Sequence, residues 1–274
     1  MRGPVDREKI TLTGAPETML ATLYCRALDS EDPRSVLHDR EAARAVARID
    51  YDFERTRVRR NATGVAFRAK QLDDWTAEFL AAHPDATVLH LACGLDTRVH
   101  RVAPPAGARW FDVDYPQVIE LRTRLLPGPP GQYRALGASV TDEDWLEQVP
   151  ADRPTVVVFE GLSMYLREAE GRRLIERIVE RFPSGQLVFD VFGTVGIRAQ
   201  HRIAAVRNSG ATLHWGVDDP RVIEGWHDRL ELLDAVSMFD IPGLQERLPL
   251  VGRWVVALLP KRLRNAGRVL RFRF

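Results

Sequence analysis

Residues 88–98 read Val-Leu-His-Leu-Ala-Cys-Gly-Leu-Asp-Thr-Arg and hold the most informative pattern in this 274-residue chain. The apolar run predicts a buried strand, and the glycine predicts a tight turn from that strand into a helix. Such a turn lets backbone N–H groups approach a ligand at the carboxyl end of a parallel sheet. The unit therefore indicates an α/β fold, although a Cys-Gly turn after a strand also occurs for purely structural reasons.

Two later strands end in carboxylates. Asp112 and Asp114 close the run Trp110–Asp114, about 20 residues after the glycine turn, where doubly wound folds place an acid that binds ribose hydroxyls. Both share one face of the strand, and Asp114 is nearer the ligand end. Its alternative role is to cap a helix that begins at Pro116. Glu160 ends another apolar run, and because an unpaired buried carboxylate is costly, a cationic ligand is its expected partner.

The surrounding pattern predicts one sheet with helices on both faces, preceded by a helical cap. We expect strands at 87–92, 109–113, 133–136, 155–160, 186–191 and 230–236, with a last, antiparallel strand at 268–274. We expect helices at 17–28, 41–49 and 63–82 in the cap, and near 97–102, 116–125, 142–148, 168–181, 196–208 and 243–259 after it. The predicted division is a cap over 1–85 and a core over 86–274 that together form one compact domain.

Composition argues against several protein classes. With 39 basic and 38 acidic residues, the chain has no positive surplus that would favour nucleic acid. Six basic residues and no acid lie in 261–274, which we interpret as a charged strand edge, with a small anion or nucleic-acid patch as the alternative. Cys25 and Cys93 form no metal-binding or disulfide pattern, and no apolar run of about 18 residues predicts a membrane span. We expect a cytoplasmic monomer or homodimer without metal, nucleic-acid or membrane partners.

Three ordered motifs, at 91–98, 110–119 and 160–166, resemble the leucine carboxyl methyltransferase family of S-adenosylmethionine-dependent enzymes. Segments 49–53, 78–86, 181–185 and 215–220 are similar to its bacterial branch of tetracenomycin-type polyketide carboxyl O-methyltransferases. The resemblance implies a Rossmann-like class I methyltransferase fold, with a seven-stranded, mostly parallel sheet. It also implies S-adenosylmethionine as the cofactor.

The resemblance implies a set of cofactor-binding residues. Arg68 is expected at the methionyl carboxylate, Glu160 at the methionyl amino and sulfonium end, and Ala92 with Gly94 at the turn beneath the cofactor. Asp114 is expected at the ribose, and Ser139 with Val140 at the adenine. Two positions depart from the family pattern, because Ala92 stands where the family usually has glycine, and Ser139-Val140 stands where it often has Asp-Leu. Both departures put the strength of cofactor binding in question.

The acceptor is expected over the carboxyl edge of the sheet, covered by the N-terminal helices and by a lid insertion at 193–220. Arg198 and Arg202 are candidates for binding an acceptor carboxylate, and Trp215 for contacting an aromatic or apolar body. Tyr165 and His214 are candidate catalytic residues. The alternative for each is structural: solvated helix arginines, a tyrosine packed in the core and a histidine that only supports the fold.

We therefore expect an O-methyltransferase that acts on a small-molecule acceptor, a carboxylate or hydroxyl of a polyketide-like product. One alternative is a methyltransferase-like protein that binds a small molecule, or catalyses another reaction, without transferring methyl. Another is a protein C-terminal carboxyl methyltransferase. A nicotinamide dehydrogenase is less favoured, because the glycine turn lacks the GxGxxG pattern that close pyrophosphate approach requires.

Overall fold

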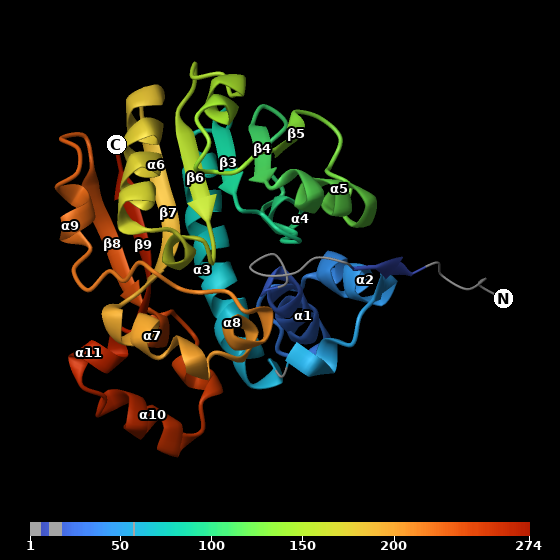
Figure 1. The fold of residues 1–274 in the computed structure, drawn as a ribbon, viewed down its shortest axis with the longest axis vertical. Coiled ribbons are helices and arrows are strands. Elements are labelled where there is room, and N and C mark those ends of the chain that lie inside the picture. The colour runs from blue at the N-terminus through green and yellow to red at the C-terminus, as the bar shows by residue number, and fades with distance from the viewer. Residues whose placement is uncertain (1–6, 11–17, 57) are drawn as a thin grey trace.

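A seven-stranded sheet with the order β5-β4-β3-β6-β7-β9-β8 lies at the centre of the molecule (Figure 1). The computed structural model describes residues 7–10, 18–56 and 58–274. The strands are β3 (Thr87–Leu91), β4 (Arg109–Asp114), β5 (Tyr133–Gly137), β6 (Thr155–Phe159), β7 (Gly185–Phe192), β8 (Glu231–Ser237) and β9 (Gly267–Arg273). β9 runs antiparallel to both of its neighbours, β7 and β8, and the other neighbouring strands of the sheet are parallel. The predicted fold class and the antiparallel last strand are confirmed.

Helices cover both faces of this sheet. Successive residues of a strand point to opposite faces, so Val88 packs in the cluster formed with α3 (Ala62–Ala82), whereas Leu89 packs in the cluster formed with α6 (Glu168–Arg181). The helices α4 (Arg98–Val102) and α5 (Pro116–Leu125) follow β3 and β4. Because β3 and β6 are buried along their whole length, their near-continuous apolar sequences are those of central parallel strands.

Two further helices, α1 (Thr18–Glu31) and α2 (Arg40–Arg48), lie beyond the carboxyl ends of the strands (Figure 1). Asp39 caps α2 by accepting a hydrogen bond from the backbone of Ala42. A short parallel pair of strands, β1 (Glu8–Lys9) and β2 (Ile49–Asp50), was not expected from the sequence. Residue 17, where we expected the first helix to begin, lies outside the described residues.

Three predicted helices are wrong in form. The helix expected at 142–148 is a 3₁₀ turn, Asp144–Gln148. The helix expected at 196–208 is divided into α7 (Thr194–Arg198), a 3₁₀ turn at Gln200–Arg202 and α8 (Ala204–Ser209). The division lets Ile197, Ile203 and Val206 pack on one apolar cluster beside Met164. Tertiary packing therefore overrides the helical pattern in this segment.

The helix expected at 243–259 is also interrupted. Only a 3₁₀ turn, Gln245–Arg247, and α10 (Leu250–Ala257) form there. Leu248 is extended, with ψ of 141°, because a residue that precedes a proline is disfavoured in helical conformation and Pro249 follows it. Two short helices, α9 (Arg221–Glu224) and α11 (Lys261–Arg264), complete the chain.

Candidate active site

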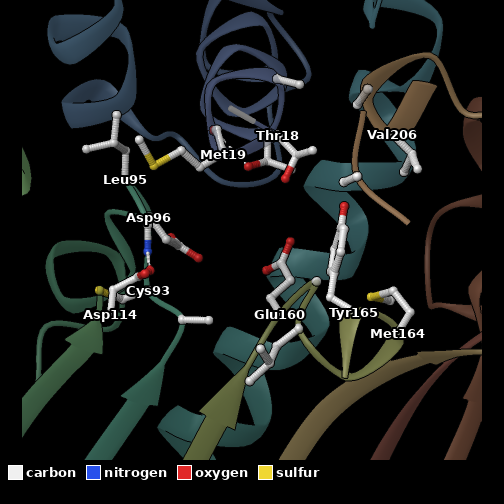
Figure 2. A pocket seen from close by; sticks show the side chains of 18 of the residues that line it. Thr18, Met19, Cys93, Leu95, Asp96, Asp114, Glu160, Met164, Tyr165 and Val206 are labelled. Atoms are coloured by element: carbon white, nitrogen blue, oxygen red, sulfur yellow. Dashed lines mark hydrogen bonds between the residues drawn. The ribbon is translucent and has the colours of Figure 1, made fainter. Parts of the chain in front are cut away.

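A cavity of about 550 Å³ opens over the carboxyl ends of β3, β4 and β6 (Figure 2). Its walls come from the strand ends, from α1 and α3, and from the segment around α8. Eight predicted site residues line it: Arg68, Ala92, Gly94, Asp114, Ser139, Val140, Glu160 and Tyr165. The sheet therefore brings together every predicted cofactor-binding residue, from segments up to 92 positions apart.

The turn after β3 is left-handed at two positions. Gly94 has φ of 49°, and a Cβ atom there would lie 3.1 Å from the Cβ of Met19 in α1. Glycine therefore meets both a backbone and a space requirement at this position. Ala92 has φ of 48°, a conformation that costs a residue with a Cβ about 1 kcal/mol or more. The alanine at this family glycine position thus carries backbone strain within the cavity wall.

Asp114 accepts two backbone hydrogen bonds. The N–H of Gly94 donates to Oδ2 at 2.7 Å, and the N–H of Tyr115 donates to Oδ1 at 2.7 Å. Tyr115, not Asp114, occupies the cap position of α5, so the alternative capping role for Asp114 is wrong. Burial raises the pKa of Asp114, and the two backbone donors oppose that rise. Each carboxylate oxygen keeps acceptor capacity, and the residue lines the cavity.

Glu160 is paired by the protein itself. Arg68 donates to its Oε1 from Nε at 3.0 Å and from Nη2 at 2.9 Å, and Arg98 donates to Oε2 at 2.7 Å. The buried carboxylate therefore has the partner that its burial was expected to require, and two protein arginines supply it before any cationic ligand binds. Burial opposes ionisation, but the neighbouring arginines outweigh it and lower the pKa of Glu160.

Arg68 bridges two strands. Besides Glu160 at the end of β6, its guanidinium binds Asp190 in β7 through Nη1 at 2.9 Å. Burial alone would lower the pKa of Arg68, but the two carboxylates raise it, so the side chain is a permanent cation. Asp190 has a raised pKa, mainly because it is buried. Three of the five N–H groups of Arg68 are used in these bonds, which leaves donors for a ligand.

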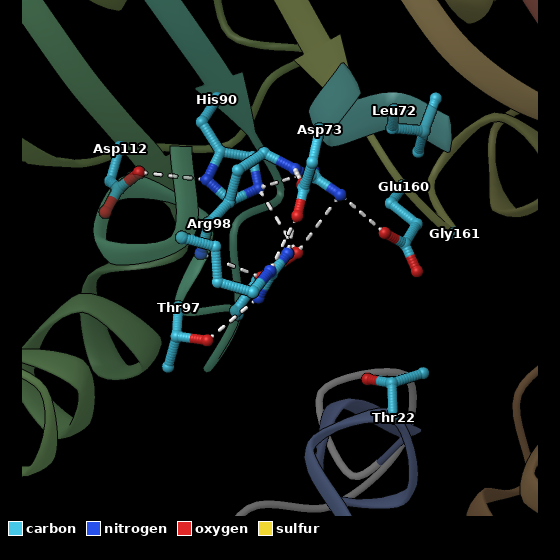
Figure 3. A network of polar contacts seen from close by, with 12 residues as sticks. Thr22, Leu72, Asp73, His90, Thr97, Arg98, Asp112, Glu160 and Gly161 are labelled. Atoms are coloured by element: carbon cyan, nitrogen blue, oxygen red, sulfur yellow. Dashed lines mark hydrogen bonds and ion pairs between the residues drawn. The ribbon is translucent and has the colours of Figure 1, made fainter. Parts of the chain in front are cut away.

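A network of buried charges supports the cavity floor (Figure 3). Arg98 is fully buried and bonds Asp73 of α3 at 2.6 Å as well as Glu160. Its Nη1 also contacts Nε2 of His90 at 3.3 Å. On its other nitrogen, His90 contacts Asp112 at 3.0 Å. Both nitrogens of His90 are therefore engaged, and this cavity-lining histidine is not a free base.

Arg26 of α1 is the one buried cation of this group that is poorly paired. Its side chain is 3% exposed, and Nη1 lies 3.8 Å from Asp96 and 4.0 Å from Glu160. Nε has no hydrogen-bond partner in the described part of the chain. Arg26 also lines the cavity, so its guanidinium, which is poorly paired within the described protein, is a candidate to bind an anionic ligand.

The two residues expected at the adenine lie side by side in the wall. Val140 is buried, and its carbonyl accepts a hydrogen bond from the indole of Trp145 at 3.3 Å. Ser139 shares a hydrogen bond of 2.7 Å with the hydroxyl of Thr141. The pair offers an apolar surface and a small hydroxyl, and it carries no charge.

The opposite half of the cavity is apolar. Tyr165 projects into it with its hydroxyl directed towards Thr18 (Figure 2), and burial raises the pKa of Tyr165. Burial also raises the pKa of Cys25 to about 12. The side chains around them are Val58, Val65, Met164, Phe192, Ile203, Val206 and Leu213.

Four predicted acceptor-side residues do not line this cavity. Arg198, Arg202 and His214 are exposed, and the backbone N–H of His214 bonds the carbonyl of Met164 at 2.8 Å. Trp215 is buried in the main core, stacked on Trp226 with ring centroids 5.5 Å apart. The part of the lid between Arg202 and His214 lines the cavity with Val206 and Leu213, so the lid contributes apolar surface rather than arginines.

Sequence reasoning missed four charged residues of the site: Arg26, Asp96, Arg98 and Asp190. Arg98 ends the glycine-turn motif and Asp190 lies near the end of β7, so their positions at strand ends were a usable signal. Arg26 sits within an apolar helix face, and a basic residue there was the signal. The N-terminal helices were expected over this edge of the sheet, but the sequence did not indicate that Arg26 of α1 would reach Glu160 and Asp96.

Comparisons with known proteins agree with this geometry. Residues 19–179 match the family model described as leucine carboxyl methyltransferase. The tetracenomycin polyketide synthesis O-methyltransferase TcmP of Streptomyces glaucescens is 47% identical over 97% of this chain and 99% of its own length. The S-adenosyl-L-methionine-dependent methyltransferase dpfgK of Gibberella zeae is 38% identical over 80% of this chain and 81% of its own.

Solved structures agree in fold. A candidate methyltransferase from Thermobifida fusca superposes with a TM-score of 0.58 and 19% identity, over 95% of this chain and 94% of the other. A protein of the duf574 family from Streptomyces avermitilis superposes with a TM-score of 0.61 and 13% identity, over 95% of this chain and 97% of the other. The relatives confirm the methyltransferase class and the cofactor class that the sequence motifs predicted. The chain belongs to the leucine carboxyl methyltransferase family.

Proposed function

We propose that this enzyme transfers the methyl group of S-adenosylmethionine to a carboxylate oxygen of a small, largely apolar acid of the polyketide type. One observation carries the proposal. A single cavity joins a charged half at the strand ends to an apolar half beneath residues 203–213. The charged half matches the cofactor, and the apolar half matches an acceptor body.

The residues of the charged half fit the cofactor. The free acceptor capacity of Asp114 suits the ribose diol, and the surface of Ser139 and Val140 suits the adenine. The spare donors of Arg26 and Arg68 suit a carboxylate. Glu160, which lines the cavity between these arginines, is the expected partner of the ammonium group, although Arg68 and Arg98 already pair its carboxylate.

When bound, S-adenosylmethionine supplies an electrophilic methyl group on a positively charged sulfur. The chain's own task is then to position the acceptor oxygen in line with that methyl, and positioning accounts for a large share of the rate in such reactions. The rigid strand ends and the buried ion pairs hold the charged half in place. The apolar half excludes water from the acceptor.

A carboxylate acceptor agrees with the titratable groups of the cavity. Among the described lining residues, His90 has both nitrogens engaged, and the raised pKa values of Tyr165 and Cys25 make their ionised forms scarce at neutral pH. A carboxylate is already ionised there and needs no general base, whereas a phenol acceptor commonly does. We assign Tyr165 as a hydrogen-bond donor that orients the acceptor carboxylate.

The test is methyl transfer from labelled S-adenosylmethionine to aromatic polyketide acids, each paired with its methyl ester and with a phenol that lacks the carboxyl group. We expect label on the acids alone, in a product that mild base hydrolyses. Base-stable label on the phenols would overturn the carboxylate assignment. Label carried by proteins of a cell lysate would identify a protein carboxyl methyltransferase instead. Cofactor binding without any methylated product would indicate a relative that does not transfer methyl.

A further inference from the structure

The helix α10 presents its apolar side chains to solvent. Leu250, Val251, Trp254, Val255 and Leu258 are between 56% and 79% exposed. They are five of the eight large apolar residues that are exposed in the described part of the chain, and Leu263 of α11, at 43%, is a sixth. Contiguous exposed apolar surface of this kind marks a binding surface more often than scattered single residues do. Figure 1 shows α10 and α11 at the edge of the molecule, beyond α7.

Helical spacing shows that this face is continuous. Leu250, Trp254 and Leu258 follow one another at intervals of four residues, and Val251 and Val255 form the adjacent row. Val256 is the only buried residue of α10 and lies on the opposite side of the helix. An ordinary surface helix turns its apolar stripe towards the core, whereas α10 turns its apolar stripe towards solvent.

Basic residues border the apolar face. Lys261 and Arg262, in α11, are exposed, and neither forms an ion pair with a described carboxylate. Arg262 contributes to the lowered pKa of Asp218, although hydrogen bonds from Thr194 are its main cause. Arg264 differs, because it is paired with Asp240. The stretch 248–266 contains four basic residues and no acid, and of the four only Arg264 is ion-paired with a described carboxylate, so this region carries a local positive charge.

We infer that α10 and α11 bind the surface of an anionic lipid bilayer. Leucine, valine and tryptophan on one side with lysine and arginine at the border are typical of helices that lie in a membrane interface. The face protrudes, and its only polar side-chain atom is the indole nitrogen of Trp254. It therefore suits an apolar layer better than a protein interface, which carries about one hydrogen bond per 100–200 Å². A second copy docked face to face would bring two sets of cations together.

This inference concerns a surface outside the cavity, and it revises the sequence-based expectation that the protein has no membrane partner. An apolar acid partitions into lipid, so contact with a bilayer would place the enzyme where such acceptors concentrate. The inference does not depend on the identity of the acceptor. Its test therefore uses lipid alone and can fail without affecting the proposed methyl transfer.

Trp254 provides a selective reporter. It is 71% exposed, whereas Trp75, Trp110, Trp145 and Trp215 are buried and Trp226 is half-buried. Acrylamide therefore quenches mainly Trp254 in the free protein. We expect vesicles of equimolar phosphatidylcholine and phosphatidylglycerol to shift its emission to the blue and to protect it from acrylamide. The protein should also float with these vesicles, and much less with vesicles of phosphatidylcholine alone.

Variants separate the contribution of the basic residues to membrane binding from that of the apolar side chains. Replacing Lys261 and Arg262 by glutamine should weaken binding about 25-fold, since each basic residue near an anionic surface contributes about fivefold. The double change Trp254→Ser with Leu258→Ser should abolish flotation. Val222→Ser removes another exposed apolar side chain, 54% exposed on α9, and should leave flotation unchanged. Because all these side chains are exposed, the variants should keep the melting temperature and cofactor affinity of the parent.

Three results would overturn the inference. The first is failure of the parent protein to float with anionic vesicles. The second is equal flotation of the Trp254/Leu258 double variant. The third is a concentration-dependent dimer in light scattering that protects Trp254 from acrylamide without lipid, which would assign the face to a second copy of the chain.

Discussion

The carboxylate of Asp114 holds the backbone N–H of Gly94, 20 residues earlier, at 2.7 Å. One bond thus ties the end of β4 to the turn that follows β3, and it fixes a left-handed glycine against Met19 of α1. The second oxygen is held by the N–H of Tyr115. The residue assigned to the ribose therefore also shapes the turn beneath the cofactor.

Asp114→Ala should lose cofactor affinity, because it removes both the residue assigned to the ribose and the hydrogen bond that holds the turn beneath the cofactor. A hydrogen bond to a charged group contributes about 1.5–3 kcal/mol, so we expect the Kd for S-adenosylhomocysteine to rise by roughly 10- to 150-fold in calorimetry. Asp152→Asn is the control, because this exposed carboxylate pairs with Arg109 at the start of β4, at the opposite edge of the sheet. Unchanged affinity in Asp114→Ala would show that the cofactor is bound elsewhere.

Ala92→Gly should stabilise the protein. Glycine relieves the left-handed strain at φ of 48°, and after the larger entropy of its unfolded chain is subtracted, a gain of about 1 kcal/mol remains. Thermal unfolding should shift upwards by roughly 2–4 °C. Ala103 has the same φ of 48° but lies outside the cavity lining, so Ala103→Gly is the matched control.

The two variants should differ in cofactor affinity. Removing the methyl group of Ala92 opens the approach to the cavity wall, whereas removing that of Ala103 changes nothing there. We expect tighter binding of S-adenosylhomocysteine only in Ala92→Gly. Equal affinity in both variants would mean that the departure from the family glycine affects stability alone.

The sheet and the cofactor wall were predictable because their signals are local. The strand and its small-residue turn follow one another directly in the sequence, and the acid ends the next strand. Because these strands are parallel, residues 92, 94, 114 and 160 lie at one edge of the sheet. The adenine pair, in contrast, was implied by the family resemblance, and the structure places it directly after β5. Each of these residues is placed by the strand that carries it.

The acceptor side was not predictable in this way. Trp215 lies in the core because its ring packs against Trp226 and beside Gly171. Both partners belong to other elements of the fold. The pairing of Glu160 with Arg68 spans 92 positions and depends on how α3 lies against the sheet. Charge pairs between distant elements are set by tertiary packing, so an isolated acid in the sequence does not reveal its own partner.

Arg26→Gln should weaken the binding of an anion. The guanidinium lies in the cavity wall with an unsatisfied Nε, and its carboxylate neighbours keep closer partners in Arg98 and Arg101. Loss of a charge-assisted hydrogen bond should raise a Kd or KM by roughly tenfold or more. Glutamine keeps a polar group but is shorter than arginine, and because Arg26 is buried beside Asp96 and Glu160 we expect a lower melting temperature as well.

The affected constant identifies the anion that Arg26 binds. A higher Kd for S-adenosylhomocysteine would assign Arg26 to the cofactor carboxylate. A higher acceptor KM with unchanged cofactor affinity would assign it to the acceptor. If neither constant moves, the spare donor of Arg26 has no role in binding. Arg44→Gln, which removes an exposed arginine paired with Glu41 on α2, controls for the loss of charge.

Acid should unfold the protein through its buried carboxylates. Burial alone would raise the pKa values of Asp96 and Glu160, but the surrounding arginines lower both. A lowered pKa in the folded state stabilises the fold above the unfolded value of about 4, and that stabilisation is lost as the pH falls through the folded value. Asp114 and Asp190 have raised pKa values in the folded state, so they make the fold more stable, not less, as the pH falls.

Urea unfolding should therefore give a free energy that is nearly constant between about pH 5 and 7 and falls below about pH 4. In Glu160→Gln this fall should be smaller, because one of the depressed carboxylates is gone, while the stability at neutral pH drops. A free energy that rises on acidification would show that the raised pair, Asp114 and Asp190, dominates instead.

Methyl transfer to a carboxylate should not depend on pH near neutrality. Tyr165 has a raised pKa, and that of Cys25 is about 12, so neither ionises between about pH 6 and 9, and the acceptor is already an anion. We expect a flat profile of kcat/KM in that range. Tyr165→Phe should keep the flat profile and raise the acceptor KM by roughly tenfold, as the loss of one hydrogen bond to a charged group predicts. A rising limb that disappears in Tyr165→Phe would instead identify the phenolate as a base, and the acceptor would then be an oxygen that must lose a proton before it accepts methyl.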